Sequence, residues 1–324
     1  MPDITYREAT LDDAELAADL MTAAYPPFAQ DPVLTRFRWE KPRRGFGYGR
    51  FIAERDGRAI AFLDWVHGPW ADVPDRHCEI EVWLERQSQE VDILVAMLRW
   101  IEERALPEGP RLFMSYCGED EAKLLHALDT LGYEKVRIEK VSELDLKVHG
   151  PSLVDQARRA REMAAAIDIR CTTLAEWDDP EKVKKLHDME RRTVEDIPHT
   201  LAMVPESFED FSRKLTGPDR PLDRFWIALH GDLPVSMSHL KFPPVRGTVW
   251  TSYTCTDPAY RGRGLAKAIK LQTLAQAFEL GVPVVCTTND AENVPILRIN
   301  RELGYTPRAG FVEHHKRVER RDDA

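Results

Sequence analysis

Three features are scarce in this chain of 324 residues, and each scarcity argues against a class of protein. There are five cysteines, none of them in a CxxC pair, so neither a disulfide framework nor a zinc site is indicated. No apolar run approaches the roughly 20 residues that a membrane-spanning helix needs. The formal net charge is -10, which disfavours a broad basic surface for nucleic acid or anionic lipid.

These scarcities predict a soluble cytoplasmic protein with reduced thiols and no bound metal. Nucleic acid and membrane are not expected as partners. The polar, acidic start of the chain, MPDITYREATLDD, does not look like a secretion signal, and no lipidation motif is seen. The length is sufficient for two domains of about 150 residues each.

An internal repeat supports the two-domain interpretation. The tripeptide LGY occurs at 131–133 and again at 303–305, which is 172 residues later. Three further pairs of similar segments occur in the same order along the chain: 108–114 with 280–286, 4–11 with 167–174, and 50–63 with 224–237. Four pairs in order predict a tandem duplication.

The repeat sets the expected domain limits and fold class. We expect one domain over 1–148, a linker helix over 149–166 after the His-Gly-Pro break, and a second domain over 167–324. Helical and strand-like segments alternate in both halves, so the fold class is α+β. The helix expected over 264–280 has a broad apolar stripe, which predicts that one side packs on a sheet.

The segment YRGRGLAKAIK, residues 260–270, places two glycines and two arginines where a predicted strand gives way to a helix. The first turn of a helix has unpaired N–H groups and a partial positive charge, and glycines allow an anion to approach the main chain closely. This arrangement is typical of a phosphate site, although a solvated basic turn is the alternative. The Walker pattern is absent, and Lys267 occupies the third glycine position of the dinucleotide motif.

These residues resemble the (Q/R)xxGx(G/A) acyl-CoA motif of the GNAT N-acetyltransferase superfamily, with Arg261, Gly264 and Ala266 at the fixed positions. The segment NDAENVPILRINRELGY, 289–305, is similar to a second conserved segment of the superfamily, and the resemblance extends over most of 167–318. It implies a mixed, mostly antiparallel sheet whose central strands splay apart to admit acetyl-CoA. The residues implied in cofactor binding are Thr254, Cys255, Thr256, Arg261, Gly262, Arg263, Gly264, Leu265, Ala266, Lys267, Asn293 and Asn300.

The first half lacks this chemistry at the matching positions. With the offset of 172, Gly262 corresponds to Glu90, Gly264 to Asp92, and the segment there reads SQEVDILVAML. Two carboxylates in place of two glycines repel phosphates and obstruct their close approach. We therefore expect residues 1–148 to keep the fold without binding the cofactor.

Catalytic residues are harder to assign than binding residues. By the resemblance, Asn300 stands where the superfamily often has a general-acid tyrosine, and Thr248 and Thr288 stand where some relatives have a catalytic glutamate. The substitute candidates are Tyr253 as acid and Glu195, Asp196 and His199 as base or amine-recognition groups. A core position is the competing interpretation for Tyr253, and a solvated loop is the competing one for the other three. Cys255 and His239 are expected to be structural rather than catalytic.

The function expected from these features is transfer of an acyl group from acetyl-CoA to an amine of a small molecule or peptide. The alternative is a non-catalytic acyl-CoA sensor or partner-binding module, which the non-matching catalytic positions favour. The two-domain layout resembles the mycothiol synthase type of acetyltransferase, but the missing tyrosine disfavours that activity. The sequence leaves the oligomeric state open, and a monomer with a pseudo-dimeric arrangement of its two domains is compatible with the repeat.

Overall fold

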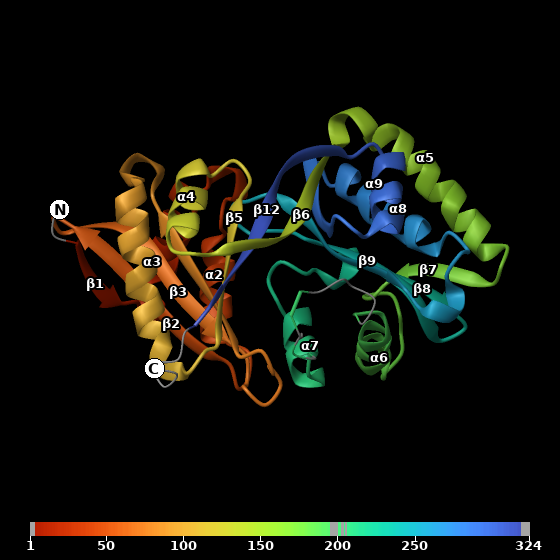
Figure 1. The fold of residues 1–324 in the computed structure, drawn as a ribbon. Helices are drawn as coiled ribbons and strands as arrows, with labels where there is room; N and C mark the ends of the chain where they lie inside the picture. Colours follow the sequence, from red (N-terminus) through yellow and green to blue (C-terminus); the bar gives the residue numbers. More distant parts are fainter. Residues whose placement is uncertain (1–3, 195–199, 202–203, 205, 319–324) are drawn as a thin grey trace.

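The computed structural model describes residues 4–194, 200–201, 204 and 206–318, and these form one continuous twelve-stranded sheet with helices on both faces (Figure 1). The strands are β1 (Ile4–Glu8), β2 (Gly47–Arg55), β3 (Arg58–His67), β4 (His77–Leu84), β5 (Leu112–Gly118), β6 (Glu134–Asp145), β7 (Ile169–Thr173), β8 (Phe225–His230), β9 (Leu233–Lys241), β10 (Val249–Thr256), β11 (Val284–Asp290) and β12 (Thr306–Arg317). The α-helices are α1 (Ala14–Ala24), α2 (Pro32–Glu40), α3 (Val91–Ala105), α4 (Ala122–Thr130), α5 (Leu146–Ala165), α6 (Lys182–Val194), α7 (Phe208–Leu215), α8 (Leu265–Glu279) and α9 (Val294–Glu302). No helix among the described residues is long and apolar enough to cross a membrane.

The tandem α+β fold predicted from the sequence is confirmed. Strands β5 and β11 have seven residues each and start 172 positions apart, at 112 and 284. Helices α4 and α9 repeat at the same offset, and each is followed by a glycine with positive φ, +78° at Gly132 and +94° at Gly304. The LGY repeat is therefore a repeated helix end, because glycine adopts the left-handed conformation that terminates a helix without a steric penalty.

The two halves exchange strands at the centre of the sheet. The strand order is β1-β2-β3-β4-β5-β12-β6-β11-β10-β9-β8-β7, so β12 lies next to β5 of the first half and β6 lies next to β11 of the second. Figure 1 shows β12 and β6 crossing side by side between the two halves. The repeat in the sequence did not predict this exchange. The domain limits 1–148 and 167–324 remain a prediction about the duplicated units, because the two units share one sheet.

The helix predicted over 149–166 is present but starts earlier, and the prediction of a His-Gly-Pro break was wrong. Helix α5 begins at Leu146, where the Asp145 carboxylate accepts hydrogen bonds from the N–H groups of Lys147 (2.8 Å) and Val148 (3.3 Å). Gly150 lies inside this helix. No larger residue fits there, because a Cβ would come within 2.1 Å of the Phe278 ring of α8. This glycine therefore permits close helix packing rather than a turn.

Helix α8 is buried on nearly all sides rather than on the single predicted stripe. Helix α5 covers its outer face, where Gln272 donates to the carbonyl of Ala157 (2.8 Å) and accepts from Arg161 (2.6 Å). Lys270 is consequently fully buried, and its ammonium nitrogen has no hydrogen-bond partner among the described residues. It lies over the ring of Tyr305 at 4.9 Å, and burial lowers the pKa of Lys270 to about 7.

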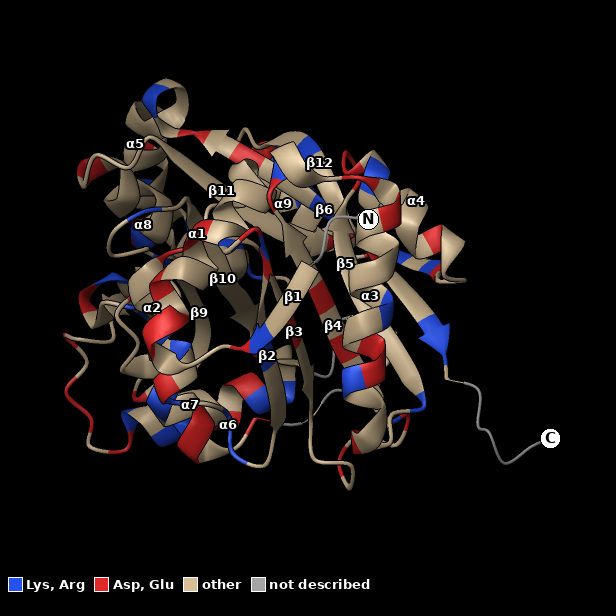
Figure 2. Cartoon of the chain, turned by 90° about the vertical axis from the view of Figure 1, so that its left-hand side faces the viewer, with Lys and Arg blue, Asp and Glu red and all other residues tan. Residues whose placement is uncertain are grey.

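Charges of both signs are interspersed over the visible elements instead of gathering on one basic face (Figure 2). This distribution agrees with the net charge of -10, in which acidic residues outnumber basic ones.

We predict that Lys270→Met stabilises the protein, by about 1–3 kcal/mol at pH 7, because it removes a buried amine that lacks a partner. The folded-state pKa of about 7 lies below the ordinary 10.5, so the unfolded chain binds more protons between these pH values and the stability of the wild type rises over that range. The gain from the variant should therefore be larger at pH 7 than at pH 10. Urea unfolding at both pH values checks this, and an equal gain at both contradicts the assignment. Lys267→Met, at an exposed pair with Glu302, is the control and should change stability by less than about 1 kcal/mol.

Candidate cofactor and acceptor site

The parallel strands β10 and β11 pair only near their starts, and the interval between their inner edges beyond that point is called the cleft below. They are paired at Val249 with Val285 and at Trp250 with Cys286, and beyond these positions the two strands diverge. The outer edges remain paired, β10 with β9 and β11 with β6, and β10 has an irregularity between Thr251 and Tyr253. The inner edges therefore present backbone N–H and C=O groups to the cleft, where an extended ligand that contains amides can bind them.

A glycine-containing loop joins the end of β10 to the start of α8. Gly262 and Gly264 both have φ of +75°, and a Cβ placed on either would meet nothing within 4 Å. Gly264 is the N-cap residue of α8, so the unpaired N–H groups of Leu265, Ala266 and Lys267 follow directly. The arrangement of strand, loop and helix N-terminus predicted from the RGRG segment is present, with open space on the side where phosphates would bind.

Side chains from other elements hold this loop in place. The carboxylate of Asp257 accepts from the Ala259 N–H (3.0 Å) and from the Arg192 guanidinium of α6 (2.7 Å). The hydroxyl of Tyr260 lies 2.8 Å from the His230 ring. The loop is thus anchored to two neighbouring elements before any ligand binds, which lowers the entropic cost of binding.

The two predicted arginines lie on the loop, where each interacts with a backbone carbonyl. Arg261 donates to the carbonyl of Thr256 (3.2 Å), and Arg263 donates to that of Ala259 (3.4 Å). Lys267 donates to Glu302 of α9 at 2.8 Å. Three positive side chains therefore lie at the loop of residues 261–264 and the first turn of α8, which together are called the phosphate cradle. Glu302 offsets the charge of Lys267.

The two predicted asparagines have different environments. The side-chain oxygen of Asn293 caps α9, accepting weakly from the Ile296 N–H (3.4 Å). Asn300 is 2% exposed and donates to the side chain of Asn289 on β11 at 2.7 Å. Asn300 thus links α9 to β11, and its predicted contact with the cofactor remains a prediction.

Tyr253 lies on the face of the sheet that α6 covers. Its hydroxyl donates to that of Thr193 at 3.0 Å, so the side chain is oriented by α6. The other predicted catalytic groups, Glu195, Asp196 and His199, lie outside the described residues.

Two nearby side chains have pKa values that bear on catalysis. Burial raises the pKa of the Cys255 thiol to about 12, which agrees with a structural role because the thiolate is absent near neutral pH. Burial also lowers the pKa of His239 well below its usual range, and its ring stacks on Phe225 at 4.2 Å. The Nδ1 atom of His239 has no hydrogen-bond partner among the described residues, unlike the satisfied polar residue expected.

Sequence reasoning missed Glu190 on α6. This side chain is half-buried, and burial raises the pKa of its carboxyl group. It lies one turn before Thr193, the residue that bonds to Tyr253. Helical spacing would have indicated it, because Glu190 follows the buried Leu186 by four residues.

The first half retains the cleft but not the phosphate chemistry. Strands β4 and β5 are paired from His77–Leu112 to Glu79–Met114 and then diverge. At the start of α3, however, Glu90 is the N-cap residue and Asp92 lies in the first turn. The carboxylates expected from the sequence therefore occupy the helix N-terminus that phosphates would need.

Comparisons with known proteins agree with this geometry. A family model described as "Acetyltransferase (GNAT) family" matches residues 183–305. A tandem GNAT protein from the clavulanic acid biosynthesis pathway superposes with a TM-score of 0.76 at 15% identity, covering 99% of this chain and 100% of its own. Residues 183–305 thus carry a GNAT acetyltransferase domain, and the whole chain shares the fold of a tandem GNAT protein.

Other solved structures of the GNAT superfamily share the whole fold. A GCN5-related N-acetyltransferase from Sphaerobacter thermophilus gives a TM-score of 0.67 at 18% identity, covering 99% of this chain and 98% of its own. A glucosamine N-acetyltransferase region of a fungal multi-domain β-N-acetylglucosaminidase also gives 0.67, at 10% identity, covering 98% of this chain and 38% of its own. No curated protein matches the chain. At these identities the structures show the fold alone.

We predict that Gly264→Asp abolishes acetyl-CoA binding, whereas Gly264→Asn weakens it by less than about threefold, since asparagine and aspartate both tolerate positive φ and both cap helices well. The two side chains have nearly the same shape, so the comparison isolates charge at the phosphate end. Calorimetric titration with acetyl-CoA measures the affinities, and equal affinity of the two variants would show that no phosphate binds at this loop. Thermal unfolding should give similar Tm values for both.

Proposed function

We propose that the protein transfers an acetyl group from acetyl-CoA to a primary amine of a small molecule or peptide, using one cofactor site in residues 167–324. The fold and the matched domain are those of acyl-CoA-dependent N-acetyltransferases in general. The observation that carries the proposal is the cleft between β10 and β11 that leads to an open glycine loop at the N-terminus of α8. In this proposal residues 1–148 contribute the fold and a wall of the site, and 149–166 connects the halves.

The described residues fit acetyl-CoA at both ends of the cleft. Backbone groups of Thr254 to Thr256 pair with the pantetheine arm, and the N–H groups of Gly262 to Lys267 bind the pyrophosphate. The cosubstrate supplies a thioester carbonyl that a neutral amine attacks directly. Asn293 and Asn300 order the segment beside the arm through the contacts that they make with α9 and β11.

The two proton transfers are assigned to groups on α6 and β10. Glu190 takes the proton of the attacking amine, because a carboxyl group with a raised pKa is a stronger base than an exposed one. Tyr253, oriented by its hydrogen bond to Thr193, returns a proton to the leaving thiolate. Glu195, Asp196 and His199 remain candidates for recognition of the acceptor.

We predict that Glu190→Gln lowers kcat by about 10²-fold or more and leaves the acetyl-CoA Kd within about twofold, since general acid–base catalysis contributes effects of this size. The control is Asp188→Asn on the same helix, at an exposed carboxylate paired with Lys184, and it should change neither quantity. Thiol release over an amine panel measures the rate. A normal rate in the Glu190 variant would remove this residue from the mechanism.

We predict one acetyl-CoA bound per chain, because Glu90 and Asp92 repel phosphates at the corresponding site of the first half. Calorimetric titration of the whole chain gives the stoichiometry, and a value near two would contradict the loss of the first site. Binding without thiol release for any acceptor would instead indicate a non-catalytic acyl-CoA-binding protein.

A further inference from the structure

A cavity of about 760 Å³ lies away from the proposed phosphate cradle, between the two halves of the chain. It extends across the diverging strands β4 and β5, at Glu81 and Tyr116, and reaches Gln89 just before α3. From the second half, α7, β9 and β11 also line it, the last through Thr288. Its volume is in the range of small-molecule sites.

Cations from both halves gather on one wall of the cavity. They are Arg38 of α2, Arg220 of the segment before β8, and Lys241 at the end of β9. Burial and the charges of Arg220 and Arg38 lower the pKa of Lys241 to about 8, so these groups lie close enough to repel one another. Neither the side chain of Arg38 nor that of Lys241 makes a hydrogen bond or ion pair within the described part of the chain, and the Arg220 guanidinium is 3.9 Å from the Asp219 carboxylate.

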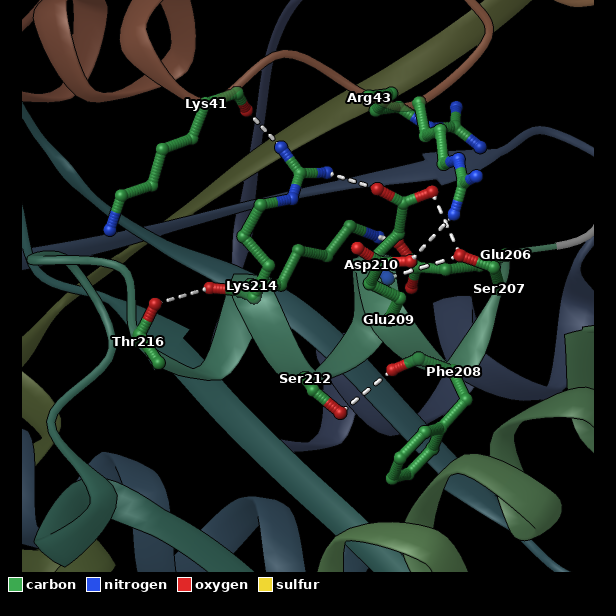
Figure 3. A network of polar contacts seen from close by, with 12 residues as sticks. Lys41, Arg43, Glu206, Ser207, Phe208, Glu209, Asp210, Ser212, Lys214 and Thr216 are labelled. Atoms are coloured by element: carbon green, nitrogen blue, oxygen red, sulfur yellow. Dashed lines mark hydrogen bonds and ion pairs between the residues drawn. The ribbon is translucent and has the colours of Figure 1, made fainter.

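Other cations nearby already have partners. Arg213 of α7 donates to Asp210 at 2.6 Å and to the carbonyl of Lys41, and Lys214 pairs with Glu206 (Figure 3). These contacts connect α7 to the segment after α2. Arg213 and Lys214 are thus satisfied internally, whereas the single carboxylate of Asp219 acts on Arg38, Arg220 and Lys241 together.

Acidic side chains line another part of the same cavity. Asp64 of β3, Glu81 of β4 and Glu139 of β6 face it, and the Oδ1 atom of Asp64 is buried without a hydrogen-bond partner among the described residues. Burial and the neighbouring Glu79 raise the pKa of Asp64, and Arg50 of β2, which also lines the cavity, opposes this shift. Burial also raises the pKa of Glu139, with Arg137 opposing it. Acidic side chains are therefore gathered in one part of the cavity, with Arg50 beside Asp64, and basic side chains in another part.

Holding unpaired like charges together costs folding free energy, and a bound counter-charge offsets that cost. We propose that the cavity binds a small zwitterion, with its carboxylate or phosphate group on Arg38, Arg220 and Lys241 and its ammonium group facing Asp64, Glu81 and Glu139. The acidic side chains exclude polyanions such as CoA from this space. The proposal concerns binding alone and does not depend on acetyl transfer.

The test uses γ-aminobutyrate and its longer ω-amino acid homologues as probes, with butyrate and butylamine as partial ligands and aminopropylphosphonate to separate carboxylate from phosphate recognition. Calorimetry at constant ionic strength, without acetyl-CoA, gives each affinity. At least one amino acid or aminophosphonate should bind about tenfold more tightly than both partial ligands, as two charge contacts predict. If no amino acid or aminophosphonate binds more tightly than its partial ligands, the proposal is overturned.

Variants place the binding within the cavity. Lys241→Gln should raise the Tm without ligand, because it relieves repulsion, and should weaken binding of the best probe about tenfold. Arg38→Gln should weaken binding of the same probe by a similar factor. Glu81→Gln should reduce the affinity for that probe to the affinity for the analogue that has the same acidic group but no amine. Arg158→Gln, at an exposed ion pair on α5, is the control and should bind as the wild type does. Unchanged affinity in both cation variants overturns the proposal.

Discussion

The exchange of β6 and β12 is the constraint on which the rest of the structure depends. Each of these strands hydrogen-bonds to the other and to the fifth strand of the opposite half, so neither half has a complete sheet without the other. The exchange also fixes where β11 lies, because its outer edge is held by β6 along the whole strand, from Val284 to Asp290. With that edge occupied, β11 is anchored while its inner edge diverges from β10 and opens the cleft.

The same framework supports different chemistry in the two halves. Both have a pair of parallel strands that diverge and a fifteen-residue helix after the loop, but the helix starts after Gly264 in one and after Glu90 in the other. Both helices bury apolar residues against the core. Glu90 and Gly264 at the helix N-termini are exposed, so these positions can differ between the halves without loss of the fold.

The sequence predicted the features that local chemistry determines. The two LGY segments indicated the tandem repeat, and the RGRG segment indicated the loop at the start of α8. The strand exchange was not predictable, because the apolar pattern of a strand does not specify which edge it pairs with. The burial of Lys270 was missed for a similar reason, since it depends on α5 covering α8. Glu190 was indicated only indirectly, by its position one helical turn after the buried Leu186.

The exchange also explains why a half without a phosphate cradle is retained. The cationic wall of the cavity is formed by Arg38 of the first half and by Arg220 and Lys241 of the second half. Both halves are therefore needed to form it. The acidic side chains come from β3, β4 and β6, and β6 belongs to the first half in sequence but pairs with β11 of the second. Loss of the first half would remove these charges and expose the outer edge of β11, which β6 now covers. The first half therefore supplies part of the sheet and of the cavity lining that the second half needs.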